Sequence, residues 1–160
     1  MSILIAGIGN IFLGDDAFGV EVAQRLAERP WPEGVRAVDF GIRGFDLAFA
    51  LLDGVDLTIF VDATPRGGEP GTLYLIEPDT RDITAEIDGH SMNPLAVLQL
   101  VKTMGGEIRR LLIVGCEPES CGEGIGLSPR VAASVDRAVE MIEEVVARAL
   151  VPALVTESRL

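Results

Sequence analysis

The sequence is poor in basic side chains, in cysteine and in histidine. Its 160 residues include 13 lysines and arginines against 25 acidic residues, which gives a formal net charge of −12. Because such a surface repels a phosphate backbone, nucleic acid is not an expected partner. Cys116 and Cys121 are the only cysteines, and no secretion signal precedes them. We therefore expect reduced core or loop thiols rather than a disulfide framework, a redox pair or a soft metal site.

Long hydrophobic runs are also missing. No stretch approaches the roughly 20 uninterrupted apolar residues that a membrane helix needs, and the N-terminal MSILIAGIGN lacks a basic region. These absences predict a cytoplasmic protein without a membrane partner. With 48% hydrophobic residues, a chain of this length can bury one substantial core. We predict one α/β domain over residues 1–150, a frayed tail over residues 151–160, and a monomer.

Short apolar runs alternate along the chain with segments of helical periodicity. Continuous apolar runs are typical of strands buried on both faces, and apolar residues three and four apart are typical of amphipathic helices. The expected strands are residues 2–6, 35–40, 57–61, 110–115 and an edge strand at 72–76 that could pair antiparallel. One helix is expected to start near residue 18, and three others are expected over residues 44–52, 91–104 and 128–150. This order predicts a three-layer α/β/α sandwich with a mostly parallel twisted sheet of about five strands.

Polar side chains gather where the expected strands end. Asp15 and Asp16 follow the first strand, while Asp39 and Asp62 close the second and third. His90, the sole histidine, precedes a helix. Since ligand chemistry in such sheets gathers at the carboxyl ends of the strands, we expect all of these residues at one edge. Two of the carboxylates with the imidazole would form an O,O,N set with open positions, suited to a divalent metal such as nickel or zinc.

Each of these residues also has a purely structural interpretation. Asp15 lies between a glycine and an apolar periodic segment, which is typical of a helix N-cap, and Asp16 would then lie in the first turn. Asp62 could close an Asx turn, and His90 could be a solvated or capping side chain. Ser91 beside His90 does not indicate a catalytic triad, because adjacent residues point apart and no GxSxG elbow is present. The convergence of these positions on one edge is what favours a site.

The glycines of the first loop leave a nucleotide site open as an alternative. Gly7, Gly9 and Gly14 follow a strand as in a dinucleotide fingerprint, with Asp39 placed to bind a ribose. The third glycine is late, however, and the two adjacent carboxylates of Asp15 and Asp16 would lie where a pyrophosphate binds. No Walker A lysine follows the loop, which excludes a P-loop. A nucleotide cofactor is therefore not expected.

Five segments together resemble the nickel-iron hydrogenase maturation endopeptidases, over nearly the whole of residues 1–150. They are GIGNIFLGDDAFG near the N-terminus, Asp62 within FVDA, PGT at residues 70–72, DGHSMNP at residues 88–94 and GIGLSPRV at residues 124–131. The resemblance implies an α/β/α hydrolase, aspartic-type by family classification, that removes a C-terminal extension from a hydrogenase large-subunit precursor after nickel insertion. It further implies that Asp16, Asp62 and His90 are the catalytic and nickel-binding residues, with the nickel brought by the precursor.

The chain departs from the family pattern in the loop after the second strand. Many relatives have a GGT-type sequence there, whereas this chain has glycines at positions 41 and 44 around Ile42 and Arg43. We expect Arg43 to be solvated, with an acidic part of the precursor as its alternative contact. Asp16 is also shorter than the Glu of some relatives. Two other classes stay open: a non-catalytic chaperone module that binds nickel or the precursor, and a nucleotide-binding enzyme that uses the GxGN loop.

Overall fold

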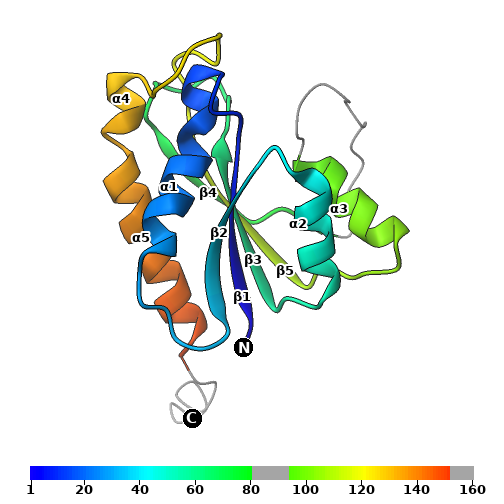
Figure 1. The fold of residues 1–160 in the computed structure, drawn as a ribbon. Coiled ribbons are helices and arrows are strands. Elements are labelled where there is room, and N and C mark those ends of the chain that lie inside the picture. The colour runs from blue at the N-terminus through cyan, green and yellow to red at the C-terminus, as the bar shows by residue number, and fades with distance from the viewer. Residues whose placement is uncertain (81–93, 152–160) are drawn as a thin grey trace.

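A five-stranded sheet lies between two layers of helices in the computed structural model, which describes residues 1–80 and 94–151 (Figure 1). The strands are β1 (Ile3–Ile8), β2 (Val35–Gly41), β3 (Leu57–Ala63), β4 (Leu73–Ile76) and β5 (Arg110–Cys116). Their order is β2-β1-β3-β5-β4; β4 pairs antiparallel with β5, and the other neighbours are parallel. The predicted α/β/α sandwich is confirmed, including the antiparallel edge strand.

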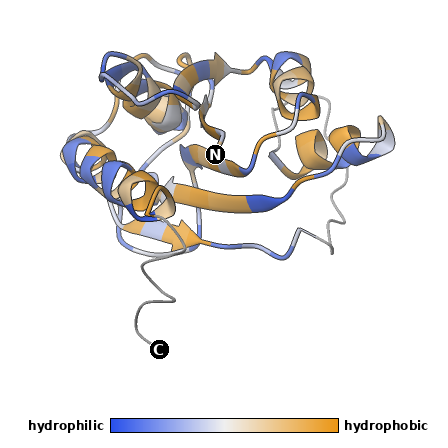
Figure 2. Cartoon of the chain, turned by 90° about the horizontal axis from the view of Figure 1, so that it is seen from below, coloured by the Kyte–Doolittle hydropathy of each residue, from blue (hydrophilic) through white to orange (hydrophobic). Residues whose placement is uncertain are grey.

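The helices cover both faces of the sheet, which explains the continuous apolar runs in the sequence. On one face lie α1 (Phe18–Ala27), the short α4 (Pro129–Ala132) and α5 (Val135–Ala149); on the other lie α2 (Gly44–Leu52) and α3 (Pro94–Thr103) (Figure 1). All of β1 and the first five residues of β3 are buried as a result. Figure 2 shows these apolar strands between the helix layers. Two hydrophobic clusters, one on each face, form the core.

The last helical segment differs from its prediction. We expected one helix from Ser128 to about Leu150, but α4 ends at Ala132 and α5 begins at Val135. At the junction the amide of Ser134 bonds the carbonyl of Val131, three residues back, and its hydroxyl donates to the carbonyl of Gly71 at 2.5 Å. This bond to the loop before β4 holds a tightened turn that interrupts the helix. The predicted apolar face is confirmed as buried, at Val131, Val135, Ala138, Val139, Ile142 and Val146.

Some sequence predictions fall outside the described residues. The start of the helix expected over residues 91–104 is one of them, because Pro94 is the first described residue of α3. The tail from residue 152 onward is likewise outside, so the division into a domain over residues 1–150 and a tail stays a prediction. Among the helices of residues 1–80 and 94–151, none is long and apolar enough to cross a bilayer.

Helix α1 packs unusually close to the sheet through two glycines. A Cβ on Gly19 would lie 2.0 Å from the carbonyl oxygen of Val61, and a Cβ on Gly7 would lie 2.4 Å from the Cβ of Ala23. No larger side chain fits at either position without moving the backbone. This contact brings the start of α1, and the 3-10 helix η1 (Gly14–Ala17) before it, close to the carboxyl end of β3.

Candidate functional site

Asp62 is the second-to-last residue of β3 and pairs in register with Gly115 of β5. Burial is the main reason why the pKa of its carboxyl is well above its usual range, and the negative charge of Asp16 raises that pKa further. The backbone amide of Ala63 acts in the opposite direction. The structure therefore brings Asp16 and Asp62 into electrostatic contact at the predicted edge of the sheet.

Asp16 lies in η1, which differs from its alternative structural interpretation as a residue in the first turn of α1. Its Oδ2 accepts a hydrogen bond from the backbone amide of Asn10 at 2.8 Å. Gly9 has a φ of 151°, and a Cβ there would lie 1.8 Å from the carbonyl oxygen of Asp16. Packing against α1 and η1 thus accounts for Gly7 and Gly9, and a carboxylate already occupies an amide that a phosphate would need.

His90, the third predicted ligand, lies outside the described residues. Within residues 1–80 and 94–151, no three His, Cys, Asp or Glu side chains lie close enough to hold a metal ion. The predicted set of Asp16, Asp62 and His90 therefore stays a prediction, of which the structure places the two carboxylates. Asp39 lies two residues before the end of β2, where its Oδ2 accepts a bond from Gln24 Nε2 at 3.2 Å.

The prediction that Asp15 caps the first helix is wrong. The residue before α1 is Ala17, and no side chain caps that helix. The Asp15 side chain, only 1% exposed, instead accepts bonds from the amides of Glu119 at 2.8 Å, Ser120 at 3.1 Å and Ser128 at 2.7 Å, and from the Ser128 hydroxyl at 2.9 Å. Burial opposes ionisation, but together these bonds lower the pKa of Asp15. Its acceptors are saturated by a loop more than 100 residues away in sequence.

Asp15 thereby anchors the loop of residues 117–127 beside the candidate site. Further backbone bonds join the same segments: Gly14 donates to Gly124 at 2.9 Å, and Asp15 donates to Ser120 at 3.0 Å. The adjacency of Asp15 and Asp16 now has a physical reason. Asp15 holds the loop, whereas Asp16 accepts a bond from the amide of Asn10 and interacts electrostatically with Asp62.

Cys121 lies in this anchored loop, close to both site carboxylates. Partial desolvation and the negative charges of Asp16, Asp15 and Asp62 raise the pKa of its thiol, while the backbone amide of Asp16 lowers it. Cys116 is buried in β5, where desolvation raises its pKa to about 11. Both are free thiols, as expected. The spacing of the two cysteines gave no signal that Cys121 is a neighbour of Asp16.

Glu117 also lies at the carboxyl edge of the sheet, and the sequence analysis did not single it out. It directly follows β5, and it is 5% exposed. Its Oε1 accepts bonds from the Tyr74 hydroxyl at 2.7 Å and from the amides of Arg66 and Gly68, both at 2.9 Å. The Tyr74 bond is the main reason why the pKa of Glu117 is lowered. The sequence did carry a signal for Glu117, because this residue follows a buried strand in the same way as Asp62 lies near the end of one. The Glu117 carboxylate fixes the loop after β3.

Replacing Glu117 with Gln should make the protein less sensitive to acid. A folded-state pKa below the ordinary value of 4.5 means that the ionised carboxylate stabilises the fold above that value and that this contribution is lost as pH falls through the folded pKa. Wild-type protein should therefore lose more stability than Glu117→Gln between about pH 5 and pH 3. Urea unfolding across this range measures the difference. Glu119 is an exposed acid in the same loop, so Glu119→Gln should show the same pH dependence of unfolding as the wild type. A pH dependence of Glu117→Gln that equals that of the wild type would contradict the role assigned to Glu117.

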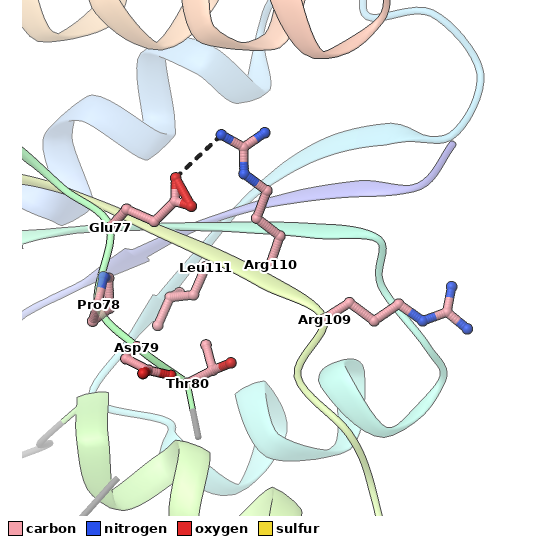
Figure 3. A pocket seen from close by; sticks show the side chains of 7 residues that line it. All are labelled: Glu77, Pro78, Asp79, Thr80, Arg109, Arg110 and Leu111. Carbon is pink, nitrogen blue, oxygen red and sulfur yellow. Dashed lines mark hydrogen bonds and ion pairs between the residues drawn. The ribbon is translucent and has the colours of Figure 1, made fainter. Parts of the chain in front are cut away.

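Two hollows lie at opposite edges of the sheet. One, of about 270 Å³, lies at the carboxyl ends of β1 and β2 and is lined by residues 9–12, Val20 and residues 39–43. The other, of about 300 Å³, is lined by Glu77–Thr80 and by residues 109–111 at the start of β5 (Figure 3). In the second, Arg110 faces Glu77 at 3.2 Å, whereas Arg109 points away and pairs with Asp56 at 2.6 Å. The two arginines do not converge on a common ligand. The first hollow borders the candidate site, because Asn10 in its lining donates its backbone amide to Asp16.

Arg43 lines the first hollow, and its guanidinium has several bonding partners. Its guanidinium donates to the carbonyls of Asp39 at 2.5 Å and Phe40 at 3.3 Å, pairs with Asp46 at 3.3 Å and lies 5.8 Å from the centre of the Phe40 ring. The side chain is 56% exposed and therefore solvated, as expected, and it is also bonded on several sides. These contacts fix the loop between β2 and α2.

Comparison with known proteins finds a matching family model and similar curated relatives. The family model described as hydrogenase maturation protease matches residues 20–145. Hydrogenase 2 maturation protease of Escherichia coli K12 is 31% identical over 145 residues, which cover 89% of this chain and 88% of that relative.

Two solved structures of such enzymes are similar to this chain in both fold and sequence. The hydrogenase maturating endopeptidase HybD from E. coli is similar with a TM-score of 0.81 at 30% identity, covering 94% of each chain. A hydrogenase 2 maturation peptidase from a Thaumarchaeota archaeon has a TM-score of 0.73 at 31% identity, covering 92% of this chain and 99% of that one.

Proposed function

The chain belongs to the hydrogenase maturation protease family, and on that premise we propose that it is a nickel-dependent endopeptidase. Its substrate is the large-subunit precursor of a nickel-iron hydrogenase, from which it removes a C-terminal extension after nickel insertion. The observation that carries this proposal is the electrostatic contact between Asp16 and Asp62 at the carboxyl edge of the sheet. The sequence expectations of a cytoplasmic monomer belong to the same proposal.

The proposed chemistry uses nickel as part of the substrate. The carboxylates of Asp16 and Asp62 and the imidazole of His90 complete the coordination of a nickel ion that the precursor already holds. Binding in this way orients the scissile peptide. The ion can then polarise the peptide carbonyl or activate a water molecule as a Lewis acid, so no protein nucleophile is required.

The electrostatics of Asp62 support a cation at this position. Burial and the charge of Asp16 both disfavour the ionised form of its carboxyl. A divalent cation beside the pair reverses that preference, because an opposite charge close by favours the carboxylate. A precursor without nickel offers no such compensation. An incomplete ligand set on the enzyme thus gives a physical basis for discrimination between loaded and empty precursor.

The intact mass of the precursor tests the proposal. Nickel-loaded large-subunit precursor should lose a C-terminal fragment when it is incubated with wild-type protein. It should keep its mass with His90→Ala, and a nickel-free precursor should also stay intact. Complex formation without any change of mass would favour the non-catalytic binding module instead. Stoichiometric nickel that survives chelation in the purified enzyme would contradict delivery of the metal by the substrate.

A further inference from the structure

A cluster of large apolar side chains is exposed next to the candidate site. The chain has six phenylalanines, of which Phe18, Phe40 and Phe60 are buried. The other three belong to a set that we call the apolar surface: Ile11 (47% exposed), Phe12 (61%), Ile42 (61%), Phe45 (71%) and Phe49 (55%). An apolar group of this kind beside a polar site is typical of a surface that binds another protein.

The members of the apolar surface lie in the first hollow and on the neighbouring helix α2. Ile11, Phe12 and Ile42 line the hollow of about 270 Å³. Phe45 follows Ile42 by three residues, and Phe49 lies one helical turn further along α2. The opposite face of α2 packs into the core through Leu47, Ala48 and Leu51. Phe45 and Phe49 therefore lie on the outer side of a helix whose inner side is already buried.

The same surface is joined directly to the candidate site. Asn10, which lines the hollow, donates its backbone amide to the carboxylate of Asp16 at 2.8 Å. Phe12 accepts a bond from the amide of Gly124 at 2.9 Å, in the loop that Asp15 anchors. A chain seated in the hollow would therefore lie beside Asn10, whose amide binds the Asp16 carboxylate.

The charges around the apolar surface define the occupant. Asp39 lines the hollow and bonds a neutral amide of Gln24. Asp46 lies between Phe45 and Phe49 in sequence and offsets the positive charge of Arg43, 3.3 Å away. With Arg43 and Asp46 paired, Asp39 leaves the rim with one net negative charge, which has the same sign as the net charge of −12 on the whole protein. A second copy of the chain would bring the same negative charge, which opposes self-association.

We propose that the apolar surface docks a segment of the protein substrate in which apolar side chains are flanked by lysine or arginine. This inference rests on the proposed function for the identity of that substrate. The apolar side chains of the segment cover Phe45 and Phe49 and enter the hollow beside Ile42. Its basic side chains face Asp39, which lines the hollow. Docking there feeds the following part of the substrate toward Asp16 and Asp62.

Two sets of variants test the docking surface with nickel-loaded large-subunit precursor as the probe. The double variant Phe45→Ser/Phe49→Ser removes the helical part, and Ile42→Ser removes a contact in the hollow. The double variant should raise both the Kd for the precursor and the KM for its processing by about tenfold or more, with kcat unchanged. Leu75→Ser is the matched control, since Leu75 is 51% exposed on β4 at the other edge of the sheet. It should bind and process the precursor like the wild type.

The binding and cleavage readouts separate this inference from the proposed function. Wild-type protein that binds the precursor but never changes its mass refutes the proposed function, while the loss of binding in the double variant still supports the docking surface. Unchanged binding in both the double variant and Ile42→Ser overturns the docking surface, whether or not cleavage occurs. A wild-type dimer that the double variant abolishes in sedimentation experiments would overturn it as well, because the surface would then bind a second copy.

Discussion

Asp62→Asn is expected to abolish processing of the precursor while leaving the fold as stable as in the wild type, or more stable. Burial and Asp16 together disfavour the ionised Asp62 carboxyl, so the neutral amide removes an unfavourable charge from the folded protein. The same change removes a proposed ligand of the nickel. Since even the partners of metal ligands contribute 10–100-fold to activity, loss of this ligand should cost more than about 100-fold in kcat/KM.

Single-turnover cleavage of the nickel-loaded precursor and thermal unfolding of the free enzyme measure the two effects. Asp56→Asn is the matched control, because Asp56 directly precedes β3 whereas Asp62 lies near its end. Asp56 bonds the amide of Ser2 at 2.8 Å and pairs with Arg109 at 2.6 Å. The control should lose some stability but keep cleavage. Full activity in Asp62→Asn would remove this residue from the proposed site.

The second large effect is expected for Asp15→Ala, and it is an effect on stability. The substitution leaves three amides and the hydroxyl of Ser128 without their acceptor, in a place where only 1% of Asp15 is exposed. Each buried donor without a partner costs about 1–3 kcal/mol, and partial access of water reduces the sum. We expect a loss of about 3–5 kcal/mol in the free energy of unfolding.

Urea denaturation of Asp15→Ala beside a surface control measures this loss. Asp136 also lies at the start of a helix and pairs with Arg25, but its side chain is 83% exposed. Asp136→Ala should cost less than about 1 kcal/mol, as exposed ion pairs do. Because the hydrogen bonds lower the pKa of Asp15, its contribution is complete above the ordinary value of 3.8 and is lost as pH falls through the folded pKa. Equal losses for the two variants at neutral pH would show that Asp15 does not anchor the loop.

The position of the candidate site could be predicted from sequence because of a general property of parallel sheets. Strands that are buried on both faces give continuous apolar runs, and their carboxyl ends share one edge. The sequence therefore predicts that Asp16 and Asp62 lie at the same edge, and the structure brings them close enough to interact electrostatically. The same reasoning applied to β5 would have singled out Glu117, which follows that strand directly.

The tasks of individual polar side chains could not be predicted in this way. Asp15 has the local sequence of a helix cap, but its acceptors are taken by amides of residues 119–128, and no local pattern encodes a bond over 100 residues. The break between α4 and α5 has the same origin, in the bond from Ser134 to Gly71. Cys121 became a neighbour of Asp16 only because Asp15 holds its loop in place.

The sequence by itself determined the layer architecture, the burial of the strands and the edge at which the carboxylates meet. These features follow from apolar periodicity and chain order, which are local and repeated many times along the chain. Only the tertiary structure decided that Asp15, rather than its neighbour Asp16, is saturated with hydrogen bonds from a distant loop, and which phenylalanines are exposed. Those outcomes depend on single contacts between distant segments, and a single long-range contact leaves no periodic signal in the sequence.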